Sequence, residues 1–492
     1  MQTKATGGIT ILGLGPGNPD QLTRAAWDWL NSIDEIYLRT GHHPVVASLP
    51  EELVVHSFDE YYEQGESFED VYRQIVEQVL ALGTRSQGVT YAVPGHPFVA
   101  EATSPEIVRR AREQGIPVKV IEGLSFLEPS FTALGLDPFP QLTLADALEV
   151  GAMHHPTFPA DQPALIAQIY SKETASRLKL TLMSVYPDEH PVKLVHAAGT
   201  SHEMVEDLHL YEIDRSPNLG LLTALYVPPL AEGASFEAFQ EIIAHLRAPD
   251  GCPWDREQTH ASLRRYLLEE TYEALEALDA DDMDALREEL GDLLLQIVLH
   301  AQIATEEGEF TMAEVLQGIH HKIVYRHPHV FSDTRVRDVA NVLANWEQLK
   351  RHEREEKGKA EKGMLDSVPL SLPALTQAQE IQDRAARVGF DWPDIQPVWE
   401  KVQEEFNEVQ AAQDEASREK ELGDLLFAVV NLVRWYKADA ETALRGTNNR
   451  FRRRFSRIEA AARQQGRELT EMTLAEMDEI WEAAKRAENG EE

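Results

Sequence analysis

The sequence Glu-Leu-Gly-Asp-Leu-Leu occurs twice in this chain of 492 residues, at positions 289–294 and 421–426. A second acidic motif, Glu-Glu-x-x-Glu, precedes each copy at 269–273 and 404–408. Two motifs in the same order and at similar spacing indicate an internal repeat of about 130 residues. That length exceeds one unit of a solenoid and suits a small domain, so the second half of the chain is predicted to hold two related domains.

Each motif is predicted to lie on an amphipathic helix. Its acidic residues are three positions apart, which on an α-helix puts two side chains on one face about one turn apart. Apolar residues flank them at helical spacing. An acidic face of this kind is usually only solvated. The segment Leu-Leu-Leu-Gln-Ile-Val-Leu at 293–299 is apolar almost all round, however, and is therefore expected to be buried.

Asp292 and Asp424 lead into the apolar segments of the two copies. Burying a carboxylate is unfavourable unless a cation or a metal pairs with it, and we expect no local Lys or Arg to neutralise either Asp. Gly291 and Gly423 precede them and suggest close approach of another backbone. The acidic residues of each copy therefore predict a metal site. They are Glu270, Glu273, Glu289 and Asp292 in the first copy, and Glu405, Glu408, Glu421 and Asp424 in the second.

The ligand type predicts the metal and its chemistry. Oxygen ligands without Cys or His partners select a hard cation, so Mg²⁺ is expected, with Mn²⁺ as its substitute. Magnesium held by carboxylates usually completes its shell with substrate phosphates. The expected reaction is metal-assisted hydrolysis of a phosphoanhydride, in which one carboxylate orients or deprotonates the attacking water. The sequence contains no P-loop, so a nucleotide would be held through its metal and separate basic residues.

Further motifs accompany the acidic ones: Gly-Cys-Pro-Trp-Asp at 251–255, Arg-His-Pro-His-Val-Phe at 326–331 and Arg-Ala-Ala-Arg-Val-Gly-Phe-Asp-Trp at 384–392. Together they resemble MazG-type nucleoside triphosphate pyrophosphohydrolases over roughly 235–488. The resemblance implies all-α helical bundles, usually dimeric, that cleave nucleoside triphosphates to the monophosphate and pyrophosphate. It assigns the same eight carboxylates to metal binding and catalysis. It assigns substrate binding to Lys322, Arg326, Asn448 and Arg450.

The first half of the chain has a different pattern. A strand is predicted over 8–14, followed by Gly-Leu-Gly-Pro-Gly at 13–17 and a helix from 22. The glycines do not follow the dinucleotide spacing, so a nicotinamide cofactor is not supported. Strand-like runs at 89–93 and 118–121 also end in glycine-containing loops. Such loops indicate close approach of backbone to a ligand at the edge of a parallel sheet.

These segments, with Ile-Tyr-Ser at 169–171 and Lys-Leu-Thr-Leu-Met at 179–183, resemble the S-adenosylmethionine-dependent tetrapyrrole (corrin/porphyrin) methylases over about 5–228. The resemblance implies two α/β lobes with the cofactor between them. This chain has His96 and Asn18 where many methylases have Asp, so a tetrapyrrole substrate is left open. The cofactor-binding residues implied by the resemblance are Gly13, Gly15, Gly17, Gly95, His96, Val99, Gly123 and Ser125.

Length and composition indicate the number of domains, the location and the partners. The length predicts about three domains, which we place at 1–230 (methylase-like) and at 231–355 and 373–492 (the two MazG-type copies), with a charged linker at 356–372. A single cysteine, Cys252, excludes an internal disulfide framework, and no signal peptide or long apolar run is seen, so the cytoplasm is expected and a membrane partner is not. The formal charge of −38 argues against non-specific nucleic-acid binding.

The leading hypothesis is a Mg²⁺-dependent nucleoside triphosphate pyrophosphohydrolase fused to a methylase-like domain, assembled as a homodimer. One alternative makes the first half the active part, a methyltransferase for a tetrapyrrole or other small molecule, with the repeats as a dimerisation module. Another makes the repeats nucleotide sensors without turnover. The sequence leaves open the preferred base, the methyl acceptor, whether one or both copies are active, and whether they pair within or between chains.

Overall fold

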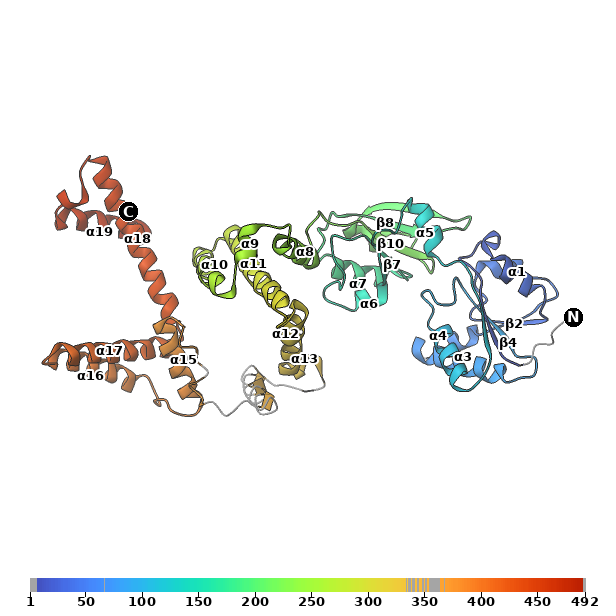
Figure 1. Cartoon of the computed structure of the whole chain (residues 1–492), viewed down its shortest axis with the longest axis horizontal. Coiled ribbons are helices and arrows are strands. Elements are labelled where there is room, and N and C mark those ends of the chain that lie inside the picture. The colour runs from blue at the N-terminus through green and yellow to red at the C-terminus, as the bar shows by residue number, and fades with distance from the viewer. Residues whose placement is uncertain are drawn as a thin grey trace. The chain divides into compact units, whose positions relative to one another are not determined.

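The two halves of the chain form two compact units, Met1–Glu257 and Gln258–Glu492 (Figure 1). No helix among the described residues is long and apolar enough to span a bilayer. Residues 356–362 of the expected linker lie outside the described part of the chain. The computed structural model describes residues 7–489 apart from 66, 333, 335–337, 339–340, 343–344, 347–348, 350–351, 354–362 and 367.

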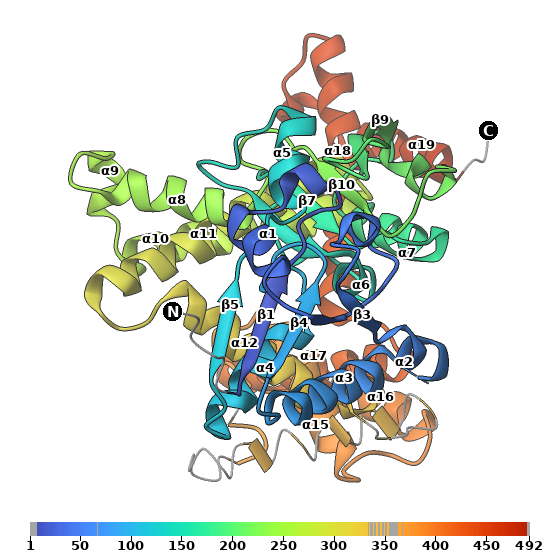
Figure 2. The same ribbon diagram turned by 90° about the vertical axis from the view of Figure 1, so that its right-hand side faces the viewer.

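The first unit begins with a parallel sheet in the order β3-β2-β4-β1-β5. Its pairs β1–β4, β1–β5, β2–β3 and β2–β4 are all parallel, and Figure 2 shows β5, β1 and β4 side by side. The strands expected at 89–93 and 118–121 coincide with two of these strands. The strands are β1 (Ile9–Gly13), β2 (Glu35–Leu38), β3 (Val54–Ser57), β4 (Val89–Val93) and β5 (Val118–Ile121).

Helices cover both faces of this sheet, which is why every residue of β1 is buried. Successive side chains of a strand point to opposite faces. Ile11 packs in one core cluster with Ile75 of α3, whereas Leu12 packs in another with Leu30 of α1. The helices of this part are α1 (Arg24–Leu30), α2 (Asp59–Gln64), α3 (Phe68–Gly83) and α4 (Thr103–Glu113).

A second sheet follows in the same unit, in the order β6-β7-β10-β8-β9. Only its β6–β7 pair is parallel, and β10 runs antiparallel to both neighbours. Residues 179–182, which carried part of the methylase resemblance, are helical. The elements are β6 (Thr143–Asp146), β7 (Ala164–Ala167), β8 (Pro191–His196), β9 (Met204–His209), β10 (Thr223–Val227), α5 (Leu127–Leu134), α6 (Ala147–Gly151), α7 (Lys172–Leu182), α8 (Phe236–Arg247) and α9 (Pro253–Glu257).

The second unit is helical in all its long elements. Both repeats contain a pair of packed helices, α10 with α11 and α16 with α17. In the first pair the turn is set by Asp281, in the left-handed conformation, and by Asp282, whose Oδ1 accepts from two backbone amides of the next helix. The helices are α10 (His260–Ala280), α11 (Met283–Glu307), α12 (Met312–Arg326), α13 (Pro328–Phe331), α15 (Ala374–Arg387), α16 (Gln396–Ala411), α17 (Glu415–Trp435), α18 (Ala440–Gln464) and α19 (Leu474–Asn489).

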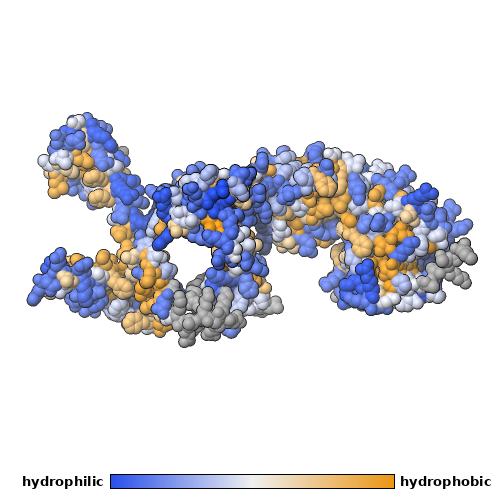
Figure 3. Space-filling model, in the orientation of Figure 1, coloured by the Kyte–Doolittle hydropathy of each residue, from blue (hydrophilic) through white to orange (hydrophobic). Residues whose placement is uncertain are grey.

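The expected burial of 293–299 is only partly observed. Val298 is buried, but Leu294 and Ile297 are 37% and 41% exposed. The second copy behaves alike, with Leu426 60% exposed. Figure 3 shows apolar side chains at the surface of the helical unit. Each paired helix covers one face of its neighbour, so part of the apolar circumference stays uncovered within one chain.

Candidate metal centres and cofactor loops

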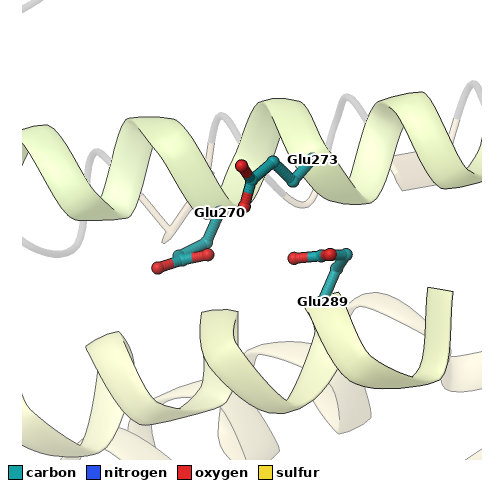
Figure 4. Close-up of side chains that lie close together, drawn as sticks. All are labelled: Glu270, Glu273 and Glu289. Atoms are coloured by element: carbon teal, nitrogen blue, oxygen red, sulfur yellow. The ribbon is translucent and has the colours of Figure 1, made fainter. Parts of the chain in front are cut away.

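The first copy brings three of its four expected metal ligands together. Helix α10 carries Glu270 and Glu273 one turn apart, and α11 places Glu289 opposite them (Figure 4). One carboxylate oxygen from each lies within 4.8 Å of the others. Asp292 stays outside this three-residue cluster, although its charge helps to raise the pKa of Glu270.

The carboxylates of the first copy repel one another. Burial raises the pKa of Glu270, and repulsion from Asp292 and Glu273 adds to this. Burial also raises the pKa of Glu289, followed by repulsion from Glu273 and Asp292. Among the described residues, no Lys or Arg forms an ion pair with these four acids. Uncompensated charge of this kind favours a bound cation.

A similar cluster forms in the second copy. Glu405 and Glu408 of α16 face Glu421 of α17, again with oxygens within 4.8 Å of one another. Glu405 is 5% exposed, and within the described chain its Oε2 and that of Glu421 have no hydrogen-bond partner. Burial and repulsion from Glu405 raise the pKa of Glu408. Asp424 stays outside this cluster, as Asp292 does in the first.

The expectation that nothing local neutralises Asp424 is wrong. Lys420, four residues earlier on the same helix, places its Nζ 3.3 Å from Asp424 and 3.1 Å from Glu421. Lys401 places its Nζ 2.6 Å from Glu405. Sequence reasoning missed both lysines because it searched for cations within one turn of the acid only. The i, i+4 spacing of each pair was the signal that would have found them.

The interpretation of Gly291 and Gly423 is also wrong for the described chain. A Cβ built at either position meets no other atom within 4 Å. No backbone of the described residues therefore approaches these glycines, because their side of the helix faces open space.

The four predicted substrate residues lie on other helices than the clusters. Lys322 and Arg326 are on α12, and Asn448 and Arg450 are on α18. The guanidinium of Arg326 is held by Glu353 at 2.6 Å. Arg450 donates to Thr447 Oγ1 at 2.8 Å. Within the described residues, neither arginine is paired with a cluster carboxylate.

In the first unit, the loops after β1, β4 and β5 meet at the carboxyl edge of the sheet. Gly15 and Gly95 exchange two backbone hydrogen bonds, of 3.2 and 2.8 Å. A Cβ at Gly13 would lie 2.5 Å from Gly123 N and 2.6 Å from Gly95 O. The chain leaves β1 towards β2 on one side and β4 towards β5 on the other, and open α/β sheets bind ligands at such a switch point.

The other expected cofactor residues lie in these loops with their polar atoms engaged. His96 Nδ1 accepts from the Phe98 amide, and Val99 N donates to His96 O. Ser125 Oγ donates to Glu128 at 2.6 Å. Gly17 has a φ of +135°, and a Cβ there would lie 3.1 Å from Thr200 Cγ2. This left-handed backbone favours glycine.

His43 is a polar residue of this edge that sequence reasoning missed. It is 6% exposed, and neither ring nitrogen has a hydrogen-bond partner among the described residues. Burial lowers its pKa to about 4, and the nearby Gly15 backbone offsets this only in part. The imidazole is therefore neutral at physiological pH. No sequence motif marked it, because its burial arises from loops that are distant in the chain.

Two family models match the chain. Residues 258–331 match the MazG nucleotide pyrophosphohydrolase domain, and residues 8–214 match the tetrapyrrole (corrin/porphyrin) methylases. A crystal structure of uroporphyrin-III-C-methyltransferase from Thermus thermophilus is similar at 23% identity and a TM-score of 0.36, covering 45% of this chain and 92% of that one.

This chain matches two curated relatives over most of their length. Uncharacterized protein YabN of Bacillus subtilis (strain 168) is 45% identical over 98% of this chain and 99% of that protein. Nucleoside triphosphate pyrophosphohydrolase of Escherichia coli (strain K12) is 49% identical over 50% of this chain and 95% of that protein. Fold and motifs thus define a two-part protein, an α/β unit of methylase type followed by a helical unit of MazG type. The chain belongs to the MazG nucleotide pyrophosphohydrolase family, with a tetrapyrrole methylase domain in its first half.

Removing the charge of Glu270 should stabilise the metal-free protein, because burial, and then repulsion from Asp292 and Glu273, disfavour that charge. Ionising Glu270 is less favourable in the folded than in the unfolded chain, because its folded pKa is raised. The resulting penalty is absent below the ordinary pKa of Glu and grows as pH rises to the raised value. Glu270→Gln should therefore raise the melting temperature near neutral pH, and the gain should vanish on acidification.

Thermal unfolding without metal, from about pH 4 to about pH 8, measures this difference. The matched control is Glu276→Gln, which replaces an exposed acid further along the same helix, α10. A gain in melting temperature that is equal for both variants, or independent of pH, would contradict the raised pKa of Glu270.

Proposed function

We propose that the helical unit hydrolyses nucleoside triphosphates to nucleoside monophosphates and pyrophosphate with Mg²⁺ as its metal. The observation that carries this proposal is the pair of carboxylate clusters, each formed across two packed helices. The Escherichia coli relative named nucleoside triphosphate pyrophosphohydrolase supports it.

The donor set fits the metal. Carboxylate oxygens are the ligands that Mg²⁺ and Mn²⁺ prefer, and the partnerless Oε2 atoms of Glu405 and Glu421 fit a cation at the second cluster. We assign Glu270, Glu273, Glu289 and Asp292 to the first site, and the matching four to the second. A bound ion would offset charge on the triphosphate oxygens. One carboxylate of the site would orient the attacking water or take its proton.

We further propose that both copies are MazG-type domains and that the chain pairs with a second copy of itself. The exposed apolar side chains Leu294, Ile297 and Leu426 support pairing, since a water-exposed apolar helix face is unfavourable in a monomer. The domain limits 1–230, 231–355 and 373–492 are kept in this proposal. Lys322, Arg326, Asn448 and Arg450 are kept as its substrate residues, although Arg326 would first have to leave Glu353.

Pyrophosphate release tests the main proposal. A panel of nucleoside triphosphates is incubated with the full chain, with and without Mg²⁺, and both products are identified. We expect metal-dependent formation of monophosphate and pyrophosphate, with the panel reporting the base preference. Nucleotide binding without turnover under any metal would favour a sensor instead.

A second candidate function, methyl transfer from S-adenosylmethionine, rests on the convergence of Gly13, Gly95 and Gly123. The methylase family match over residues 8–214 supports it. A Cβ at Gly13 or Gly123 would meet the backbone of a neighbouring loop, so these glycines let the three loops close together at the switch point of the sheet. The remaining cofactor residues lie in the same loops. Binding of S-adenosylhomocysteine, followed by methyl transfer to candidate acceptors, tests this function.

A further inference from the structure

The two carboxylate clusters carry matching acids but different neighbours. Four residues before Glu405 stands Lys401, whereas Tyr266 stands four residues before Glu270. Directly before Glu421 stands Lys420, and the first copy has Glu288 at the matching position. The second cluster therefore gains two positive charges, and the first gains an additional negative one.

Lys401 is the stronger of the two internal cations. Its Nζ lies 2.6 Å from Glu405, whose side chain is 7% exposed, and 3.1 Å from Glu404. Lys401 donates to both carboxylates, and these charge-assisted contacts hold its ammonium beside the second cluster. Lys420 is 71% exposed, and solvent screens its pairs with Glu421 and Asp424.

A metal ion entering the second cluster must compete with the ammonium of Lys401. Charges a few ångströms apart near a protein surface interact strongly enough to change affinity by at least about tenfold. Among the described residues, no Lys or Arg pairs with the acids of the first cluster, so a metal ion entering it competes with no internal cation. Metal without nucleotide is therefore held more tightly by the first cluster.

The second cluster is nevertheless not satisfied by its lysines. Glu405 is only 5% exposed, yet its Oε2 has no hydrogen-bond partner among the described residues. The Oε2 atom of Glu421 has none either. A triphosphate brings several negative charges of its own, which restore the attraction for a metal that the lysines cancel. Nucleotide and metal should thus enter this cluster together.

We propose that the first cluster binds its metal without nucleotide, whereas Lys401, aided by Lys420, makes metal binding at the second cluster depend on nucleotide. This inference rests on the proposed function, because it takes both clusters as metal sites. The two copies would then differ in the order in which they bind metal and nucleotide, because, among the described residues, only the second copy has lysines beside its acids.

Titration of the full chain with Mn²⁺, measured by electron paramagnetic resonance, tests the inference. The variant Glu421→Gln/Asp424→Asn isolates the first cluster, and Glu289→Gln/Asp292→Asn isolates the second. Without nucleotide, we expect the first cluster to bind Mn²⁺ at least about tenfold more tightly. Adding an α,β-methylene nucleoside triphosphate should reduce this difference in Mn²⁺ affinity between the two clusters. Equal Mn²⁺ affinities without the nucleotide would overturn the inference.

Reciprocal variants test the role of the lysine itself. Lys401→Met should raise the nucleotide-free Mn²⁺ affinity of the second cluster about tenfold, and Tyr266→Lys should lower that of the first by a similar factor. Lys401→Gln serves as a second variant if circular dichroism shows that the Met variant loses helix. Unchanged affinities in folded variants would overturn the inference. Absence of pyrophosphate release by wild type with Mg²⁺ would instead contradict the proposed function, while the order of Mn²⁺ binding still tests the lysine.

Discussion

Replacing two of the proposed metal-binding acids in each copy is expected to abolish pyrophosphate release. The chain with Glu289→Gln, Asp292→Asn, Glu421→Gln and Asp424→Asn should lose activity by about a thousandfold or more, since the metals that offset phosphate charge would have no adequate ligands. Amide replacements keep the volume and the helical propensity close to those of the acids. The loss should therefore reflect charge and not unfolding.

Pyrophosphate release with saturating Mg²⁺ measures this effect, and circular dichroism checks that the helices remain. Each double variant alone should remove the activity of its own copy, so the pair of measurements assigns turnover to one copy or both. Glu276→Gln and Glu419→Gln, exposed acids on α10 and α17, serve as matched controls. Full activity in the fourfold variant would refute the carboxylate assignment.

Adding one methyl group at Gly123 is expected to weaken the proposed cofactor binding of the first unit about a hundredfold. The Cβ of Gly123→Ala would lie 2.5 Å from Gly95 O and 2.8 Å from both C and O of Gly13. These are backbone atoms in paired loops, so all three loops must move apart. Overpacking of this kind costs about 1–3 kcal/mol, and displacement of a binding loop by about 1 Å can lower productive binding a hundredfold.

Calorimetric titration of the full chain with S-adenosylhomocysteine measures the affinity, and thermal unfolding measures the strain. Gly220→Ala is the control, because a Cβ at that position meets nothing within 4 Å. It should leave both quantities unchanged. Wild-type affinity in Gly123→Ala would show that the cofactor does not use these loops, whereas equal loss in both variants would point to general destabilisation.

Much of the architecture follows from short stretches of sequence. Strand β4 coincides with the run at 89–93, whose residues are all buried, as the centre of a parallel sheet requires. Strand β5 at 118–121 is rich in β-branched residues and lies at the edge of the sheet, where Lys119 is tolerated. Glu270 and Glu273 share a helix face because they are three residues apart. These relations are local, so they can be predicted without knowing the fold.

Other features depend on segments that are distant in the chain. The partial exposure of Leu294 could not be predicted from its own helix, since exposure depends on which faces the neighbouring helix covers. His43 became notable only when loops from separate strands closed around it. The pairs that Lys401 and Lys420 form with Glu405 and Asp424 are, by contrast, local, because each joins residues four apart on one helix.

Residue spacing alone determined that Glu270 and Glu273, like Glu405 and Glu408, share one face of a helix, and that glycines follow the strands of the first half, because helix periodicity and backbone freedom are properties of a few adjacent residues. Packing decided that Glu289 faces Glu270 and Glu273 while Asp292 stays outside their cluster. Electrostatic energy depends on distance in space, and distances across two helices are set by how the helices pack and not by either helix alone.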